Sequence, residues 1–292
     1  MQRYRSVPEL ARIPHRLLDE HAFLLLDQAH AQGDFWQQLP GSPIAPALLA
    51  GERDALPRLV AVAWLDRDQR TRMLDHLLTA SPEAPRPVAA LLATAVNHDK
   101  LVEHLRARLI VTIPEQGKHL FRYYDPRVFR HVLWMATPAQ VATLFGPVET
   151  WTWCNHQGDW YSSHPPEGMR PELAFRPRVL DLARIGVLER CLKALRQTVP
   201  GFIDDADNVQ ARRVNALLDA ARLHGLTDEA DLRLYVVQAI RFHPDIHGHP
   251  ELARRLRTAG ADDSYVGACS DLDADTLTRY AREIASPRKE HA

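Results

Sequence analysis

The sequence predicts an α+β protein: a mixed α/β N-terminal lobe with a central mixed sheet, followed by an all-α C-terminal lobe. Short apolar runs alternate with amphipathic stretches up to about residue 165, which is typical of strands and helices that share one core. The segment 165–171 is rich in Pro and Gly and reads as a linker. Beyond it the periodicity is helical throughout. The predicted domains are therefore residues 1–165 and residues 172–292.

The first half of the N-terminal lobe alternates strands with capped helices. Three apolar runs have the composition of buried strands: residues 22–26, 58–65 and 87–96. Asp66 with Gln69 forms a capping-box pattern that starts a helix, and Asn97 is positioned to cap a second one. The apolar face of the first helix consists of Met73, Leu74, Leu77 and Leu78.

A β-hairpin and a helix follow. Residues 109–113 and 118–124 flank the turn-forming segment 114–117, which begins with Pro and ends with Gly. Asp125 then stands at an N-cap position with Pro126 in the first helical position, a strong signal for a helix start.

The end of this lobe again contains a predicted capped helix and a predicted hairpin. Thr137, Pro138 and Gln140 predict another capped helix. Residues 148–154 and 159–162 predict a second hairpin, which carries three tryptophans: Trp151, Trp153 and Trp160.

The C-terminal lobe is predicted to contain only helices. Residues 178–198 and 207–224 form two of them, with Gly225 as the residue that ends the second. Thr227 opens a third helix, and Pro250 and Asp273 begin two shorter ones.

Composition and charge exclude several classes of function. The 36 Lys and Arg residues balance 37 Asp and Glu residues, which argues against a nucleic-acid-binding or membrane-bound protein. The three cysteines are scattered, as expected of reduced thiols, and the thirteen glycines lack the spacing of a dinucleotide loop, a phosphate loop or a nucleophile elbow. The N-terminus lacks a signal-peptide pattern, and the longest apolar run, 88–96, is about half the ~18–20 residues that span a bilayer. We expect a cytoplasmic protein without cofactor or catalytic activity.

Two groups of residues are candidates for a site. Arg122, Asp125, Pro126 and Arg127 are interpreted as a structural motif in which Asp125 caps its helix and pairs with an arginine; an anion clamp is the alternative. The second group is aromatic. Half of its members should face outward on alternating strand positions and could anchor a partner: Tyr123, Tyr124, Trp151, Trp153 and Trp160.

Three patterns offer competing functions. A metal-assisted hydrolase could use the turn that carries His243, Asp245, His247 and His249, although two prolines and a glycine there make convergence of the side chains unfavourable. Pairs of a nucleophile with a nearby histidine occur at 154–156 and 162–164, but adjacency in sequence is poor evidence for a catalytic pair. The helices at 207–242 could imitate a DNA-binding helix-turn-helix, but acidic residues offset their arginines, so a solvated face is expected.

Five strings within residues 22–153 carry a resemblance to a known family: Leu24–Ala29, Leu56–Val60, His98–Leu109, Phe121–Val128 and Leu144–Val148. The most specific is Arg-Tyr-Tyr-Asp-Pro-Arg-Val at 122–128, followed about twenty residues later by Phe-Gly-Pro. Together they resemble the type VI secretion adaptors, or effector chaperones, over less than half of the chain. The resemblance implies an adaptor that binds a toxic effector protein and loads it onto the valine-glycine-repeat spike protein. The effector segment would lie along an exposed sheet edge or an aromatic-lined cleft.

Overall fold

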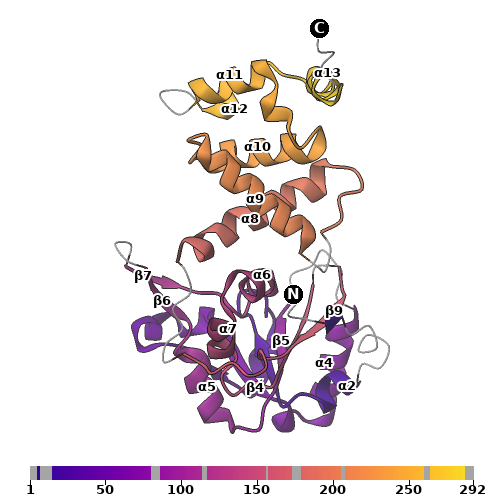
Figure 1. Cartoon of the computed structure of the whole chain (residues 1–292). Coiled ribbons are helices and arrows are strands. Elements are labelled where there is room, and N and C mark those ends of the chain that lie inside the picture. Colours follow the sequence, from indigo (N-terminus) through magenta and orange to yellow (C-terminus); the bar gives the residue numbers. More distant parts are fainter. Residues whose placement is uncertain are drawn as a thin grey trace, which may run out of the picture. The chain divides into compact units, whose positions relative to one another are not determined.

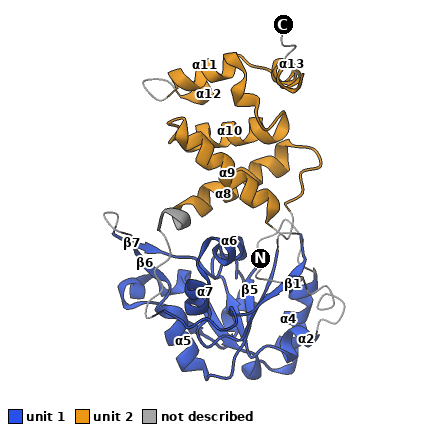
Figure 2. Cartoon of the chain, in the orientation of Figure 1, with its two compact units in different colours: residues 1–182 blue, residues 183–292 orange. Residues whose placement is uncertain are grey.

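The computed structural model describes residues 5–6, 15–79, 86–113, 117–155, 157–172, 179–204, 208–259 and 264–286. The chain divides into two compact units, residues 1–182 (unit 1) and residues 183–292 (unit 2), shown in Figure 2. Unit 1 contains a sheet with helices and unit 2 is helical, which confirms the predicted fold class.

Unit 1 is built on a seven-stranded sheet (Figure 1). In spatial order its strands are β1 (Arg5–Ser6), β9 (Trp160–Ser163), β8 (Thr150–Cys154), β5 (Val88–Ala93), β2 (Phe23–Leu26), β4 (Arg58–Ala61) and β3 (Ser42–Pro43). All of these neighbouring strands pair antiparallel, so the pairing is more uniform than the mixed sheet predicted. The register places Phe23 of β2 opposite Leu92 on one side and Ala61 on the other.

Helices cover both faces of the sheet, which explains why its central strands are apolar at every position. On one face, α2 (His15–Asp19), α3 (Asp34–Gln38) and α4 (Arg67–Thr79) share a core with β2 and Trp160. On the other face, α6 (Pro126–Met135) and α7 (Pro138–Phe145) bring Phe129 and Phe145 onto Trp151 of β8.

Most of the predicted caps are present. Asp66 and Gln69 form the reciprocal capping box, with distances from backbone nitrogen to side-chain oxygen of 2.8 and 3.1 Å. Asn97 caps α5 (His98–Arg106) by accepting a hydrogen bond from the backbone N–H of Lys100. One residue of the predicted α4 face is wrong: Leu78 is exposed because Met73 and Leu77 occupy the stripe that faces the sheet.

Several predicted strands are longer than the observed ones; the run 87–96, for example, is a strand only over Val88–Ala93. The run 58–65 leaves the sheet after Ala61 and forms the short 3₁₀ helix η2 (Val62–Trp64), which leaves Trp64 exposed; a longer 3₁₀ segment, η1 (Ala47–Ala55), precedes this strand. The first hairpin forms a separate two-stranded sheet from β6 (Ile110–Ile113) and β7 (Gly117–Leu120). Its second strand ends at Leu120, not at Tyr124, because the chain turns there into α6. The tip residues 114–116 lie outside the described ranges.

Unit 2 begins within α8, and the elements found among its described residues are all helices. These are α8 (Val179–Thr198), α9 (Val209–Leu223), α10 (Glu229–Arg241), η3 (Ile246–Gly248), α11 (Pro250–Thr258), α12 (Tyr265–Ala268) and α13 (Ala274–Ala285). Gly225 ends α9 with φ +84°, and the hydrogen bonds from Gly225 to Arg222 and from Leu226 to Ala221 close a Schellman motif. The cap of α10 is Asp228, one residue after the predicted start.

The division between the units falls inside α8, later than the Pro-rich segment at 165–171. That segment is held to unit 1 at its end, where the backbone N–H of Glu172 donates to the Thr143 hydroxyl (2.7 Å) and the Gln140 amide bonds the Glu172 carboxylate. The domain boundaries at 165 and 172 remain predictions. None of the helices in the described ranges has both the length and the apolarity needed to cross a bilayer.

Candidate functional site

Asp125 lies buried at the start of α6, and its carboxylate binds both the backbone and the side chain of Arg127. Its carboxylate accepts a hydrogen bond from the backbone N–H of Arg127 (3.0 Å), which caps the helix as the sequence predicts. The guanidinium of Arg127 donates to both oxygens of the same carboxylate: Nε lies 3.0 Å from Oδ1, and Nη2 lies 2.7 Å from Oδ2. Pro126 supplies the first helical position, where a backbone N–H would have no helical partner.

Arg122 connects this cap to a carboxylate far away in sequence. Its Nη2 lies 2.9 Å from Oδ2 of Asp27 and 3.8 Å from Oδ2 of Asp125. Asp27 directly follows β2 and is only 4% exposed. We call the series Asp27, Arg122, Asp125 and Arg127 the charged ladder. In the sequence, the one sign that Asp27 could belong to this ladder is its position directly after a buried apolar run.

The charged ladder joins the end of β2 to the start of α6. Two carboxylates and two guanidinium groups compensate one another, and the buried carboxylates are the partners that would be most costly to leave unpaired. The backbone of Asp27 also donates to the carbonyl of Pro87, which fixes the start of β5 to the same point. This arrangement suits a structural network that holds three segments in register.

All five predicted aromatic anchors are buried, and none is more than 4% exposed: Tyr123, Tyr124, Trp151, Trp153 and Trp160. The prediction that half of them face outward is wrong, because helices cover both faces of the sheet that carries the three tryptophans, and Tyr123 and Tyr124 lie in the buried turn between β7 and α6. The first four pack around Phe129 or one another, and the Tyr123 hydroxyl donates to the carbonyl of Leu105. Contact of these residues with a partner is untested, and it would require this packing to open.

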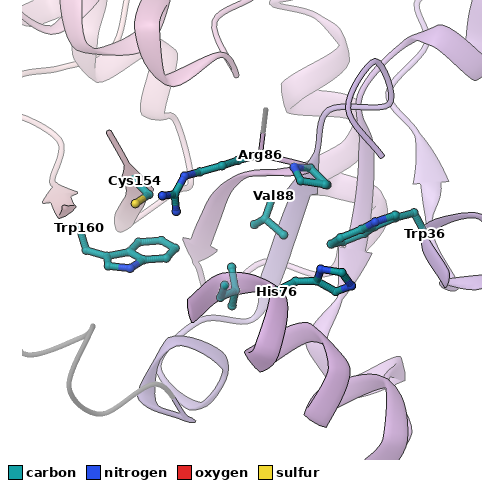
Figure 3. A pocket seen from close by; sticks show the side chains of 8 residues that line it. Trp36, His76, Arg86, Val88, Cys154 and Trp160 are labelled. Atoms are coloured by element: carbon teal, nitrogen blue, oxygen red, sulfur yellow. The ribbon is translucent and has the colours of Figure 1, made fainter. Parts of the chain in front are cut away.

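Trp160 packs on the opposite face and lines a pocket that the sequence did not indicate (Figure 3). We call it the tryptophan slot. It has a volume of about 270 Å³, part of it open to solvent, and Trp36 and Trp160 lie on opposite sides of it. Val88 lies between them (Figure 3), Leu77 also lines the pocket, and Arg86 and His76 are its polar lining residues.

The electrostatics of the slot are set by its basic groups. Burial, together with the charge of Arg72, lowers the pKa of His76, so its ring is neutral near pH 7. The ring stacks on Phe35 with a centroid distance of 5.2 Å and is tilted against Trp36 at 4.7 Å. Arg86 extends toward Cys154 (Figure 3). Burial nevertheless raises the pKa of the Cys154 thiol to about 12, so Cys154 is a protonated packing residue. Its proposed partner in a thiol–imidazole pair, His156, lies outside the described residues.

The histidine turn, residues 243–249, does not gather its ligands. The His243 Nδ1 accepts a hydrogen bond from the backbone of Asp245, and His247 stacks on Tyr235 with a ring-centroid distance of 3.5 Å. His249 caps α11 and pairs with Glu283. Across the described ranges, no three His, Cys, Asp or Glu side chains form a group that could hold a metal ion. The geometry therefore gives no support to the metal-assisted hydrolase.

The remaining catalytic pattern is also dispersed. Ser162 shares a hydrogen bond with Thr152 (2.7 Å), which in turn bonds the buried His21 (2.8 Å). Ser163 is fully buried against Trp153, and His164 bonds the backbone of Glu149 instead of either serine.

In the predicted DNA-binding helices of unit 2, residues 207–242, Arg222 lies 4.0 Å from Asp219. Two acidic residues of these helices pair with arginines of α8: Asp219 with Arg184 and Glu229 with Arg190. These pairs fit the solvated helical face that the charge pattern predicts.

An antiparallel sheet with helices on both faces and a buried charged ladder defines unit 1 as an α+β domain. Residues 22–143 match the model of a family described as "Domain of unknown function (DUF4123)". The match runs from the start of β2 into α7 and includes the whole charged ladder. Searches of curated proteins and of solved structures found no match.

Proposed function

We propose that this protein is a cytoplasmic adaptor that binds a cognate type VI secretion effector and loads it onto the valine-glycine-repeat spike protein. The observation that carries the proposal is the match of residues 22–143 to a domain family over the same stretch that resembles the secretion adaptors. The most specific string of that resemblance, residues 122–128, forms the helix-capping half of the charged ladder. The proposal therefore rests on a segment with a defined structural role.

A free strand edge offers one docking surface for an extended effector segment. Strand β7 is exposed at all four positions and pairs only with β6 among the described strands. The bond from the Phe121 N–H to the Leu109 carbonyl sets the alternation of the hairpin, which directs the N–H groups of Lys118 and Leu120 away from β6. Such an edge can accept an added strand.

The test is co-expression of the tagged chain with the proteins encoded beside its gene. We expect one neighbour, the effector, to co-purify stoichiometrically, and the spike protein to join when it is added. Retention of neither protein would contradict the proposal, whereas an unrelated effector serves as the negative control.

A proline at the β7 edge tests the docking surface itself. Lys118→Pro removes an outward N–H without removing a bond to β6, so the hairpin should persist while effector retention falls. Lys118→Ala removes the same charge and keeps the N–H, and it should retain the effector. Equal retention by both variants would show that the effector docks elsewhere.

A further inference from the structure

We propose that the open edge of β7 recognises an antiparallel partner strand that carries an apolar residue, any one residue and then Asp or Glu, in that order. The identity of the partner as the effector rests on the proposed function, whereas the motif rests on the hairpin alone. Three features carry the inference: the outward backbone groups of β7, two rows of side chains that end at its edge, and the charge of Lys118.

The backbone groups along β7 fix how a partner strand aligns. Strands β6 and β7 pair with Ile110 opposite Leu120 and Thr112 opposite Lys118. The N–H and C=O groups of Lys118 and Leu120 point away from β6, so an antiparallel partner exchanges two hydrogen bonds with each of these residues. The two partner residues that face Lys118 and Leu120 are therefore two positions apart.

Side chains on one face of the hairpin form two rows that run across it toward the open edge. Ile110 and Leu120 form an apolar row, and Leu120 at its end is 43% exposed. Thr112 and Lys118 form a polar row, and both are exposed. The other face carries Val111, which is buried, so the two rows lie on the face turned away from the core. An apolar partner residue opposite Leu120 would extend the first row, because cross-strand apolar pairs stabilise a sheet.

The charge of Lys118 specifies the partner residue that continues the polar row. Its ammonium group forms no ion pair with any residue that the structure describes, and neither β6 nor β7 contains an acidic residue. Asp or Glu opposite Lys118 would complete this row with a pair of opposite charges. Because the pair is exposed, it adds little affinity and chiefly discriminates against a basic residue at that position.

A second copy of β7 does not supply the acidic residue. Antiparallel pairing of two β7 edges places Lys118 opposite its own counterpart, opposite Leu120 or, beyond the strand, opposite Arg122. The first arrangement brings like charges together, and none of the three provides a carboxylate. The charge pattern therefore favours a different chain as the occupant.

Panning of a random heptapeptide library, displayed multivalently on phage, identifies the preferred strand. The target is the intact wild-type chain, and peptides that also bind Lys118→Pro, which lacks one outward N–H, are subtracted. Multivalent display makes weak pairing at an edge measurable. We expect the remaining peptides to share an apolar residue two positions before Asp or Glu. The absence of this shared pattern, or its equal enrichment on Lys118→Pro, would overturn the inference.

Reversal of the charge tests the acidic position. Lys118→Glu should bind a synthetic copy of a selected peptide about fivefold more weakly, and a peptide with Lys in place of its acidic residue should regain this affinity. Lys118→Ala should lose only about twofold, as expected for an exposed pair. Lys100→Glu is the matched control, because Lys100 is also exposed but lies in α5, and it should bind like the wild type. An equal loss in Lys100→Glu, or no recovery with the Lys peptide, would contradict recognition at β7.

The order of the motif tests the direction of the partner strand. The double variant Lys118→Leu, Leu120→Lys exchanges the ends of the two rows, so antiparallel pairing predicts that the selected peptides carry Asp or Glu two positions before the apolar residue. The unchanged order in this variant would be the opposite of what the inference requires.

Carbodiimide coupling locates the acidic residue independently, because it joins a lysine amine to a carboxylate that lies against it. The lysines of the chain are Lys100, Lys118, Lys193 and Lys289, so the coupled residue can be assigned by mass spectrometry of a digest. The peptide selected on the wild type should couple to Lys118. Coupling chiefly to another lysine would place the peptide elsewhere and overturn the inference.

Peptide binding and effector retention are separate measurements. If the wild-type chain retains its effector but selects no peptides with the motif, the inference about β7 fails and the adaptor proposal stands. If the motif is selected and no neighbouring protein is retained, the recognition at β7 stands and the adaptor proposal fails. When both hold, Lys118→Glu should reduce effector retention relative to Lys100→Glu.

Discussion

The charged ladder of unit 1 and the histidine turn of unit 2 each concentrate polar side chains within a few residues of sequence, yet the ladder's side chains contact one another, whereas those of the turn contact separate neighbours. Arg122 reaches Asp27 across 95 positions of the chain. In the histidine turn, by contrast, His247 stacks on Tyr235 and His249 on Tyr280, so the two imidazoles serve different neighbours.

The difference comes from where the backbone points the side chains. A helix N-terminus presents free N–H groups that hold the Asp125 carboxylate in one place, and the arginines then have a fixed target. The histidines occupy a short 3₁₀ turn between two helices, where successive side chains diverge. Polar density in sequence therefore signals a site only where the local backbone makes the side chains converge.

The most severe test of this comparison is Asp125→Ala. We expect a loss of about 3 kcal/mol in unfolding free energy, from a lost N-cap and from lost charge-assisted hydrogen bonds. Urea unfolding followed by tryptophan fluorescence measures it within unit 1, because all six tryptophans lie before residue 183. Asp125→Asn keeps a capping oxygen and should lose about half as much. A stable Asp125→Ala protein that no longer binds its effector would favour the anion clamp instead.

Acid should destabilise unit 2, because His247 of the histidine turn is buried in its neutral form. Burial, and then the nearby His224, lowers the pKa of His247 to about 3, so its imidazole takes up a proton on unfolding below about pH 6.5. Stability therefore falls as the pH falls from 6.5 toward 3, by about 2 kcal/mol for this group at pH 5 relative to pH 7.5.

Far-UV circular dichroism during urea unfolding at pH 7.5 and pH 5 measures this loss. His247→Gln keeps an amide donor near Gln238 but cannot titrate, so it should reduce the acid sensitivity. His104 in unit 1, with a pKa lowered to about 4, contributes a separate loss that this variant leaves in place. Unchanged acid sensitivity in His247→Gln would contradict the burial argument.

Arg122→Gln tests the long-range contact of the charged ladder, the ion pair between Arg122 and Asp27. The arginine side chain is 39% exposed, so solvent screening reduces the expected loss to about 1 kcal/mol, or a fall of about 3 °C in the unfolding midpoint. Arg53→Gln, which breaks only an exposed pair, should leave the midpoint unchanged. Equal midpoints for the two variants would mean that Asp27 is held by its backbone contacts and not by Arg122.

Local patterns predicted much of this fold. The caps at Asp66, Asn97 and Asp125 and the end of α9 at Gly225 are written in a few adjacent residues, and the structure has each of them. The predicted strand lengths were less accurate, because an apolar run does not show where its pairing with the neighbouring strand stops. Strand β4, for example, stops pairing at Ala61.

Features built from several elements were not accessible in the same way. The partner of Arg122 lies at the end of another strand, and the tryptophan slot combines residues from α3, α4, β5 and β9. The outward aromatics were mispredicted for the same reason, because alternation along a strand does not reveal whether a helix covers its second face.

The smallest loss of unfolding free energy is expected for a substitution of His243 in the histidine turn. His243 accepts one hydrogen bond from the backbone of Asp245, so His243→Ala should change the unfolding free energy by no more than about 0.5 kcal/mol. Zinc or a chelator should move the unfolding midpoint of the wild type by less than about 1 °C, since three ligands at about 2 Å are needed to hold the ion and these imidazoles are committed elsewhere. Stoichiometric zinc in the purified protein, lost in a His243→Ala, His247→Gln double variant, would mean that the turn rearranges to converge, and the contrast with the charged ladder would then no longer hold.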